Sequence, residues 1–86
     1  MRFLVETSFK QSASSELLAL IPAEIEHGKA LDVQGIREAL YVSSNQDKAW
    51  QIYRGDSAAA VQRIVETFPL YPFLDVSIIP LADQAS

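Results

Sequence analysis

Glu6 is the side chain in this sequence that is best placed for acid–base chemistry. It lies in the segment Arg2–Phe9, where side chains alternate between two faces, and it is expected on the face opposite to Phe3 and Val5. We therefore expect it to point away from the helices, toward a face that a partner covers. Partial burial of a carboxylate favours its protonated form, so Glu6 is our first candidate for a general base that exchanges protons near neutrality. The alternative is a structural ion pair with one of three arginines, Arg2, Arg37 or Arg54.

His27 is the second candidate catalytic residue, because imidazole is the side chain that ordinarily exchanges its proton near neutral pH. It falls on the first predicted helix, beside an apolar stripe, and Glu24 stands one turn earlier. That spacing allows contact, so Glu24 could orient the imidazole. The alternative is a solvated histidine with a weak contact to Glu24, since no second catalytic group stands next to it in the sequence.

Arg37 could bind the carboxylate of a ligand, because a guanidinium offers two parallel hydrogen bonds. Arg37 and Glu38 open a predicted strand on opposite faces, so one of them should point toward the cleft side of the sheet. The alternative is a strand-end charge pair of little energetic value. Aromatic rings could form the walls of a pocket for a small unsaturated ligand, or they could simply fill the core and an interface. The rings in question are Tyr41, Trp50, Tyr53, Tyr71 and Phe73.

The composition excludes several classes of protein. The chain has no cysteine and one histidine, so we expect neither a disulfide nor a metal site. Its net charge of −4 argues against nucleic-acid binding. Three glycines and no nucleotide-binding loop predict no cofactor. No apolar run approaches the roughly 20 residues that a membrane span needs. We therefore expect one cytoplasmic domain over residues 1–86, without membrane or nucleic-acid partners.

The pattern of the chain predicts six elements. Strands are expected at residues 2–9, 36–43, 48–54 and 73–81, and helices at about 15–34 and 58–68. Pro22 should kink the first helix or begin a second segment, and Gly35 should end it. The order βαββαβ is typical of an α+β, ferredoxin-like fold, with a four-stranded antiparallel sheet and two helices on one face.

The first helix should bury a stripe of residues at spacings of three and four: Leu18, Ile21, Ile25, Gly28 and Leu31. Ser14 or Ser15 should cap it, and Asp56 or Ser57 should cap the second helix. The second helix should direct Val61, Ile64, Val65 and Phe68 inward.

Two short helices leave one face of the sheet uncovered, and that face is apolar. It includes Leu4, one of the pairs Leu40/Val42 or Ala39/Tyr41, and one of the pairs Trp50/Ile52 or Gln51/Tyr53. Burying about 800 Å² of it would contribute on the order of 20 kcal/mol, at about 25 cal/mol per Å² and before association costs. We therefore expect a homodimer that pairs these faces by a two-fold axis into a barrel-like body.

The segment Phe68–Leu81 reads FPLYPFLDVSIIPL, and its two prolines must end the preceding helix. Asp75 interrupts the strand that follows and could accept hydrogen bonds from the Pro69–Pro72 turn or from the edge of another subunit. Together with the start Met1–Val5 and the helix end at Gly35, this segment resembles the muconolactone isomerase family. The order of elements agrees over nearly the whole chain, and the C-terminal motif is its specific part.

This resemblance implies a ferredoxin-like, dimeric α+β barrel that can assemble further into rings. It implies a cofactor-free isomerase that moves a proton between carbons next to a lactone carbonyl, with Glu6 as base. Arg37 and a tyrosine would hold the substrate anion near the subunit interface. The chain departs from the family in the strand Ile36–Val42, which is poor in Trp, Arg and His, and at Asp83–Ala85, where the family has a basic residue and a His-Pro pair.

Two other functions remain open. The chain could be a non-catalytic dimeric barrel that binds a ligand or supports assembly, with Glu6 and Arg37 as interface ion pairs. It could also be a cofactor-free oxygenase, which would need a roomy aromatic-lined cavity within one protomer. A polar pocket where Glu6, His27 or Arg37 converge would favour an enzyme, whereas a dry packed interface would favour the non-catalytic barrel.

Overall fold

The computed structural model describes residues 1–10 and 14–82. Over these residues the chain forms four strands and two α-helices in the expected order, which confirms the α+β class. The elements are β1 (Arg2–Phe9), α1 (Ser15–Val33), β2 (Arg37–Val42), β3 (Lys48–Arg54), α2 (Ala58–Glu66), the 3₁₀ turn η1 (Tyr71–Phe73) and β4 (Leu74–Leu81). The segment Asp83–Ala85, where the sequence departs from the family, lies outside the described residues.

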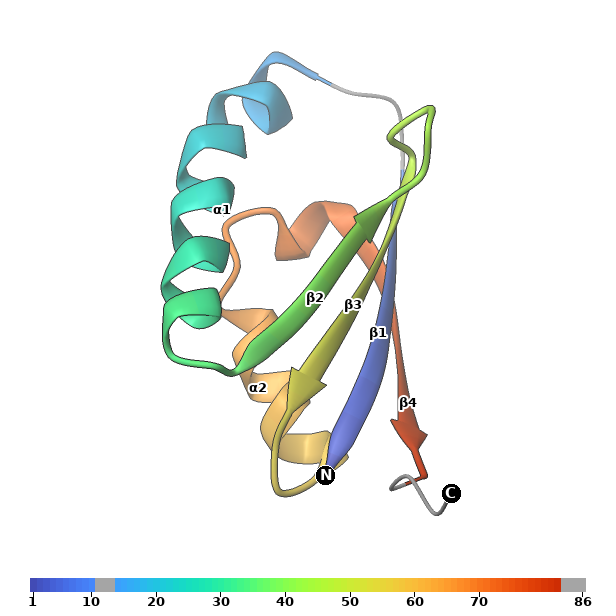
Figure 1. Cartoon of the computed structure of the whole chain (residues 1–86). Coiled ribbons are helices and arrows are strands. Elements are labelled where there is room, and N and C mark those ends of the chain that lie inside the picture. Colours follow the sequence, from blue (N-terminus) through green and yellow to red (C-terminus); the bar gives the residue numbers. More distant parts are fainter. Residues whose placement is uncertain (11–13, 83–86) are drawn as a thin grey trace.

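The strands form one antiparallel sheet in the order β2-β3-β1-β4. Both helices lie on the same side of it (Figure 1), as the ferredoxin-like plan predicts. The ladder between β2 and β3 contains a β-bulge. Arg37 lies opposite Tyr53 while Ala39 lies opposite Ile52, so Glu38 is an extra residue in β2.

The strand register decides which side chains face the helices. Phe3 and Val5 are buried beneath them, and the pairing of β1 with β3 places Tyr53 and Gln51 on the same face. Leu40 pairs with Gln51 and therefore also faces the helices. The opposite side, which we call the far face, carries Ala39 and Tyr41 from β2 with Trp50 and Ile52 from β3.

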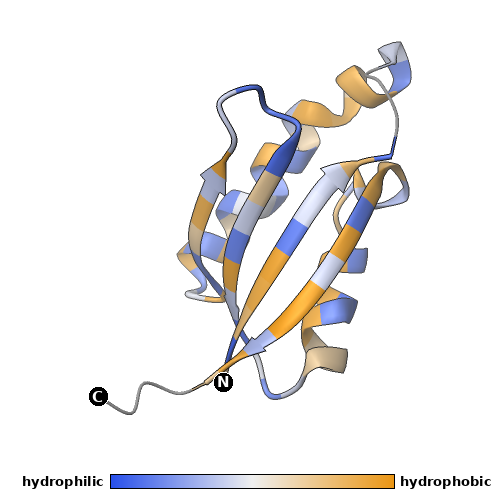
Figure 2. Ribbon diagram, turned by 90° about the vertical axis from the view of Figure 1, so that its right-hand side faces the viewer, coloured by the Kyte–Doolittle hydropathy of each residue, from blue (hydrophilic) through white to orange (hydrophobic). Residues whose placement is uncertain are grey.

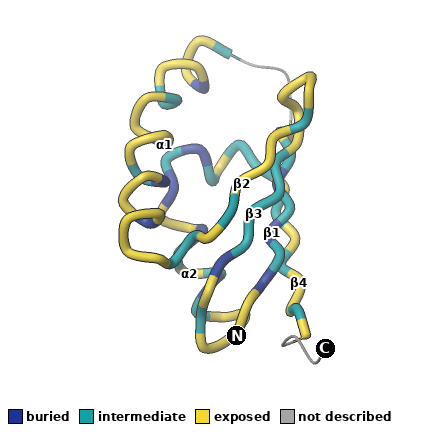
Figure 3. Tube along the Cα trace, viewed as in Figure 1, coloured by how far each residue is buried: buried dark blue, intermediate teal, exposed yellow. Residues whose placement is uncertain are grey.

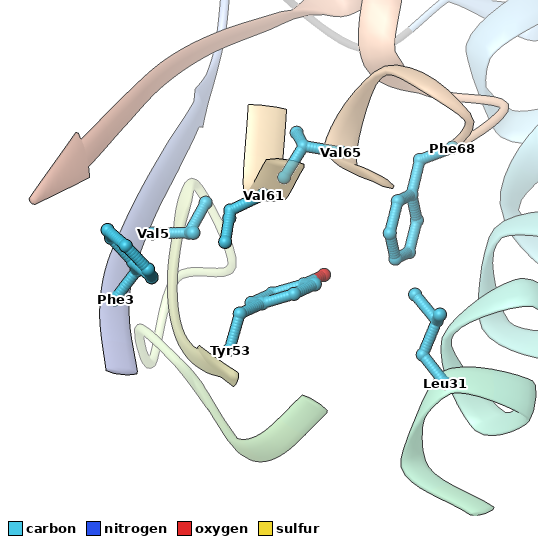
Figure 4. Packing of buried hydrophobic residues seen from close by; sticks show 7 residues of the cluster. All are labelled: Phe3, Val5, Leu31, Tyr53, Val61, Val65 and Phe68. Carbon is cyan, nitrogen blue, oxygen red and sulfur yellow. The ribbon is translucent and has the colours of Figure 1, made fainter. Parts of the chain in front are cut away.

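The hydrophobic core fills the space between the sheet, α2 and the C-terminal part of α1. Its buried members are Phe3, Val5, Leu31, Tyr53, Val61, Val65 and Phe68 (Figure 4). Strand alternation supplies the first two, because every second residue of β1 points toward the helices. The predicted inner face of α2 is confirmed, with Ile64 partly buried against this cluster.

The second helix ends two residues earlier than predicted, at Glu66. Ser57 caps its start through a hydrogen bond from the Ala60 N–H, at 3.1 Å from N to Oγ. Phe68 is buried although it lies beyond the helix. The prolines at positions 69 and 72 cannot donate backbone hydrogen bonds, and a 3₁₀ turn therefore leads into β4.

Helix α1 is continuous through Pro22, so the predicted start of a second segment there is wrong. A proline within a helix removes one backbone hydrogen bond. Leu17 before Pro22 and Leu31 after it are both buried, so packing anchors the helix on each side of the proline. The Ser14 side chain also caps the start of the helix, accepting from the Leu17 N–H at 3.1 Å. Gly35 follows the helix with φ of 75°, as expected for a glycine that ends one.

The predicted buried stripe of α1 is only partly buried. Gly28 and Leu31 are buried, but Leu18 and Ile25 are 53% and 52% exposed, which corrects the expectation for these two. Much of the helix is exposed (Figure 3). The reason is that the N-terminal part of α1 stands away from the sheet and borders an open cleft.

The far face of the sheet is apolar at its centre, as the sequence predicted. Figure 2 views the sheet from this side, with the helices behind it. Leu4, Trp50 and Ile52 are half-buried there, whereas Tyr41 and Ile79 are 66% and 47% exposed. Such a contiguous apolar area is unusual on the surface of a monomer and typical of an interface.

Candidate functional site

A cavity of about 970 Å³, partly open to solvent, lies between α1 and the helix side of the sheet. We call it the α1 cleft. Its apolar walls include Phe9, Leu18, Ile21, Ile25, Leu40 and Val42. Polar and charged side chains line the same space, among them Glu24, Lys29, Asp32, Arg37, Lys48 and Gln51. A cavity that combines apolar walls with polar groups able to orient a ligand is the usual form of a small-molecule site.

Arg37 is the main positive charge inside the α1 cleft. Its Nε and Nη2 donate to the two carboxylate oxygens of Asp32 at 2.7 and 3.0 Å, and its Nη1 donates to Gln51 Oε1 at 3.3 Å. The Arg37 side chain is only 10% exposed, whereas that of Asp32 is 47% exposed. The hydrogen bonds from Arg37 hold the pKa of Asp32 below its usual range. The guanidinium is thus fixed in direction and stays charged.

Gly28 allows the guanidinium to lie against α1. A Cβ atom at this position would be 2.6 Å from Arg37 Nη2 and 2.9 Å from both Arg37 Cζ and Nη1. A side chain at this position would therefore require the guanidinium to move from where it lies. The sequence placed Gly28 on the apolar stripe, and the structure shows that its role is to make room for Arg37.

Tyr53 supports the cleft from behind. It is buried, and its hydroxyl donates to Gln51 Oε1 at 2.7 Å. Burial raises the pKa of Tyr53, so the hydroxyl remains a donor at neutral pH. Gln51 Oε1 therefore accepts from two donors, Tyr53 and Arg37, and Gln51 itself lines the cleft. Gln51 thus lies between Arg37 and the Tyr53 hydroxyl, and the expectation that Arg37 and a tyrosine hold a substrate anion stays a prediction.

Glu24 is the functional candidate that the sequence reasoning treated only as a partner of His27. It lines the α1 cleft, and its Oε1 accepts the backbone N–H of Leu70 at 2.9 Å. Burial raises the pKa of Glu24, and the Leu70 hydrogen bond and the charges of His27 and Arg37 partly oppose this. Its spacing offered a signal, since Glu24 follows Ile21 by three residues and therefore shares the apolar side of the helix.

His27 lies beside the second helix and not among the residues that line the cleft. Its Nε2 is 2.7 Å from Thr67 Oγ1, and the Thr67 hydroxyl in turn lies 2.5 Å from the Ile64 carbonyl oxygen. The single hydroxyl hydrogen goes to that carbonyl, so Nε2–H of His27 donates to Thr67. The imidazole also meets the Phe68 ring edge-on, with centroids 4.7 Å apart. These contacts join α1 to the end of α2.

Glu6 points to the far face, as its parity predicted. Its Oε1 accepts from Trp50 Nε1 at 3.0 Å, and its Oε2 is 4.0 Å from Lys48 Nζ. Tyr41 lies across from Trp50 on the same face. Arg37 is on the opposite side of the sheet, so one protomer does not bring Glu6 and Arg37 together. The bulge at Glu38 causes this separation, because it changes the side to which Arg37 points.

The remaining charged residues of the far face form a small network. Glu38 lies 2.6 Å from Arg2 and 3.8 Å from Arg54, measured from carboxylate oxygen to Nε. Hydrogen bonding from Arg2 lowers the pKa of Glu38. In the Pro69–Pro72 turn, the Leu70 N–H donates to Glu24, not to Asp75 as predicted. Asp75 lies across from Ser8 in the sheet.

Within residues 1–10 and 14–82, no group of three or more His, Cys, Asp or Glu side chains could hold a metal ion. None of the helices in the described part of the chain is long and apolar enough to span a membrane.

Comparisons with known proteins agree with this architecture. The sequence model of the family described as muconolactone delta-isomerase matches residues 1–86. No curated protein sequence matches significantly. Among solved structures, a crystal structure of muconolactone isomerase is similar with a TM-score of 0.85 and 20% sequence identity. The similarity covers 100% of this chain and 93% of the other, and at this identity it shows the shared fold.

Proposed function

Because this chain belongs to the muconolactone delta-isomerase family, we propose that it is a cofactor-free isomerase of small unsaturated lactones or related organic acids. The reaction would remove a proton from one carbon of the ligand and return it to another, so that no atom or electron is gained. Such a reaction needs a base, a group that stabilises negative charge on oxygen, and a site that limits access of water.

The α1 cleft is the observation that carries this proposal. Its volume of about 970 Å³ is at the upper end of the range of roughly 300–1,000 Å³ that is usual for small-molecule sites. Arg37 provides a nearly buried positive charge beside the apolar walls of the cleft. Electrostatic attraction is stronger there than in bulk water. A ligand carboxylate, or the oxygen that becomes negative when a proton leaves, would therefore be directed toward Arg37.

Isotope exchange tests the proposed activity directly. The protein is incubated in D₂O with muconolactone and related unsaturated lactones, and NMR follows deuterium incorporation and double-bond migration. We expect exchange at carbons next to the lactone carbonyl. No exchange with any of these lactones, together with no ligand-induced rise in Tm, would overturn the proposed function.

Substitution of Arg37 tests where the ligand binds. Loss of a charge-assisted hydrogen bond costs about 1.5–3 kcal/mol, so Arg37→Gln should weaken lactone binding about 10- to 100-fold. Arg63→Gln is the matched control, since Arg63 is an exposed arginine on α2. Equal affinities for both variants would place the ligand elsewhere.

The far face supports the proposal of a homodimer, or of a larger assembly built from such dimers. Leu4, Tyr41, Trp50 and Ile52 form an apolar area with Arg2, Glu38 and Arg54 among its neighbours. A polar margin around an apolar centre is typical of protein interfaces. Glu6 lies on this face, so a catalytic role for Glu6 requires a second protomer to bring the ligand-binding groups to it. That role stays a hypothesis.

A ligand-binding module without catalysis is the second candidate function, and one observation favours it. Asp32 already occupies two donors of Arg37 and offsets its positive charge, so a bound anion is attracted less strongly than it would be by an unpaired guanidinium. For a binding module we expect lactones or organic acids to raise Tm without any deuterium exchange. The same NMR experiment therefore separates the two functions.

A further inference from the structure

We propose that Glu24 carries the proton in the α1 cleft, taking it from one carbon of a bound lactone or unsaturated acid and returning it to another. The inference rests on the proposed function and assigns the base for it. It differs from the sequence-based choice of Glu6, which lies on the far face of the sheet beside Trp50.

Position is the first argument for Glu24. Three carboxylates line the cleft, and two of them are engaged by side chains. Asp32 is held at both oxygens by Arg37. Asp47 lies at the hairpin and accepts from the Ser43 hydroxyl at 2.9 Å. Glu24 is the third, and it lies on α1 among the apolar residues that form the wall of the cleft.

The hydrogen bonding of Glu24 is the second argument. Leu70 N–H binds Oε1 at 2.9 Å and so fixes the direction of the carboxylate. Among the described residues, no side chain is hydrogen-bonded to Oε2. One oxygen is thus used for positioning while the other can accept a proton from a ligand. A backbone donor suits this purpose because it keeps its own proton throughout the reaction.

The electrostatic surroundings are the third argument. Partial burial of Glu24 favours the protonated carboxyl, while the charges of His27 and Arg37 favour the ionised form. Opposing influences of this kind bring the two forms closer in free energy, which a group that both takes and returns a proton requires.

The proposed step balances without any further reactant. In an α,β-unsaturated lactone the C–H bond at the carbon γ to the carbonyl breaks, the proton moves to Glu24 Oε2, and the electron pair delocalises onto the carbonyl oxygen. Arg37 stabilises the resulting negative charge. The Glu24 carboxyl exchanges its proton with solvent, the electron pair then takes a proton back from it to form a C–H bond at the carbon next to the carbonyl, and the carboxylate is regenerated.

The variant Glu24→Gln tests the assignment, because the amide oxygen of glutamine can still accept from Leu70 N–H. We expect deuterium exchange into the lactone to fall at least about 100-fold, the usual contribution of a general base. The ligand-induced rise in Tm should persist. Glu26→Gln is the matched control, since Glu26 is an exposed glutamate on the same helix, and its exchange rate should equal that of the wild type.

The outcomes separate this inference from the proposed function. If Glu24→Gln exchanges deuterium at the wild-type rate, Glu24 is not the base, although the isomerase proposal stands. If the wild type itself shows no exchange, the isomerase proposal fails and the inference fails with it. If Glu24→Gln remains folded by circular dichroism but loses binding as well as exchange, Glu24 is a ligand-binding residue and the assignment is overturned.

Discussion

The residues that could bind or transform a ligand lie on the helix side of the sheet, and two of them depend on a glycine and a backbone amide. Gly28 makes room for Arg37, and Leu70 N–H fixes Glu24. Neither dependence is visible in the types of residue alone. Arg37 was predicted as an anion-binding residue because its chemistry is unambiguous. Glu24 was assigned a supporting role because its partner, Leu70, is distant in sequence.

The variant Gly28→Ala gives a prediction at the residue scale, because the sign of the change in stability depends on whether Arg37 packs against this position. Alanine in place of glycine normally stabilises an exposed helix interior by about 1 kcal/mol. Here the new Cβ would lie 2.6 Å from Arg37 Nη2 and would displace the guanidinium from its hydrogen bonds. We expect Gly28→Ala to destabilise the protein by about 1–3 kcal/mol in chemical denaturation.

The background variant Arg37→Ala provides the control for this prediction. Without the guanidinium the same Gly28→Ala change should stabilise the helix, by about 1 kcal/mol. A stabilising effect in the wild-type background as well would show that Arg37 does not pack against Gly28.

The pH dependence of stability provides a second prediction at the residue scale. The pKa of Glu24 is raised in the folded protein, chiefly by burial. Above its unfolded pKa the folded state therefore binds more protons at this site than the unfolded state. The stability that protonation contributes is present at low pH and is lost as pH rises through the folded pKa.

Glu24→Gln removes this titration, so we expect the variant to be more stable than the wild type at neutral pH. The difference should shrink as the pH falls to about 4, where the wild-type carboxyl is protonated in both states. Urea denaturation of the two proteins across this range measures it. Glu26→Gln should show no such pH-dependent gain, and a constant difference for Glu24→Gln would contradict the prediction.

At the scale of elements, the alternation of side chains along a strand was the most reliable guide to which residues are buried. The buried parity of β1 was predicted from its own sequence, because Phe3 and Val5 face one way. In β2 and β3 both parities are mixed, and only the pairing of strands decides between them. The bulge at Glu38 could not be foreseen, since nothing in the residue types of Ile36–Val42 marks an extra residue.

Helix α1 shows another limit of sequence patterns. A stripe of apolar residues predicts which side of a helix faces away from bulk water, but it does not predict whether that side faces a packed core or an open cleft. Leu18 and Ile25 face the cleft and are half exposed, whereas Leu31 is in the core. The same periodicity is therefore consistent with a packed core and with the wall of a binding site.

The end of α1 gives a prediction at this scale. Gly35 has φ of 75°, and nothing lies within 4 Å of the position that a Cβ would occupy. The cost of Gly35→Ala should therefore come from the backbone alone, at about 1–2 kcal/mol. Thermal and chemical denaturation measure it. Gly35→Asn should cost less, because asparagine tolerates this conformation better, and equal costs would argue against the left-handed turn.

At the scale of the whole molecule, the order of elements and the sheet-and-helix layers were predictable because each local pattern agreed with the same topology. The family resemblance rested on the C-terminal motif and agrees with the match over residues 1–86. The cleft was not predictable, because it is formed by the distance between α1 and the sheet. No short-range pattern in the sequence reports that distance.

The far face leads to a prediction about assembly. Tyr41 is 66% exposed on the edge strand β2, beside Trp50 in the apolar area, and should become buried in a homodimer. A buried aromatic residue in an interface can contribute about 2 kcal/mol or more, so Tyr41→Lys should raise the dimer dissociation constant at least about 30-fold. Sedimentation over a range of concentrations measures this.

Val33→Lys is the control for the assembly prediction, because Val33 is 88% exposed at the end of α1, on the helix side of the sheet. It should leave the dissociation constant unchanged. A wild-type protein that is monomeric at high micromolar concentration, or equal effects of both variants, would exclude the far face as the interface.

The extra residue in β2 has one more consequence. In an unbroken strand, positions 37, 39 and 41 would all project to one side, so the guanidinium would emerge on the far face across from Arg54. Deleting Glu38 would make Arg37 and Ala39 consecutive residues on opposite faces, so the guanidinium would remain on the helix side. The inserted residue thus lets one strand keep its cation for a small molecule while it presents its tyrosine ring to the opposite surface.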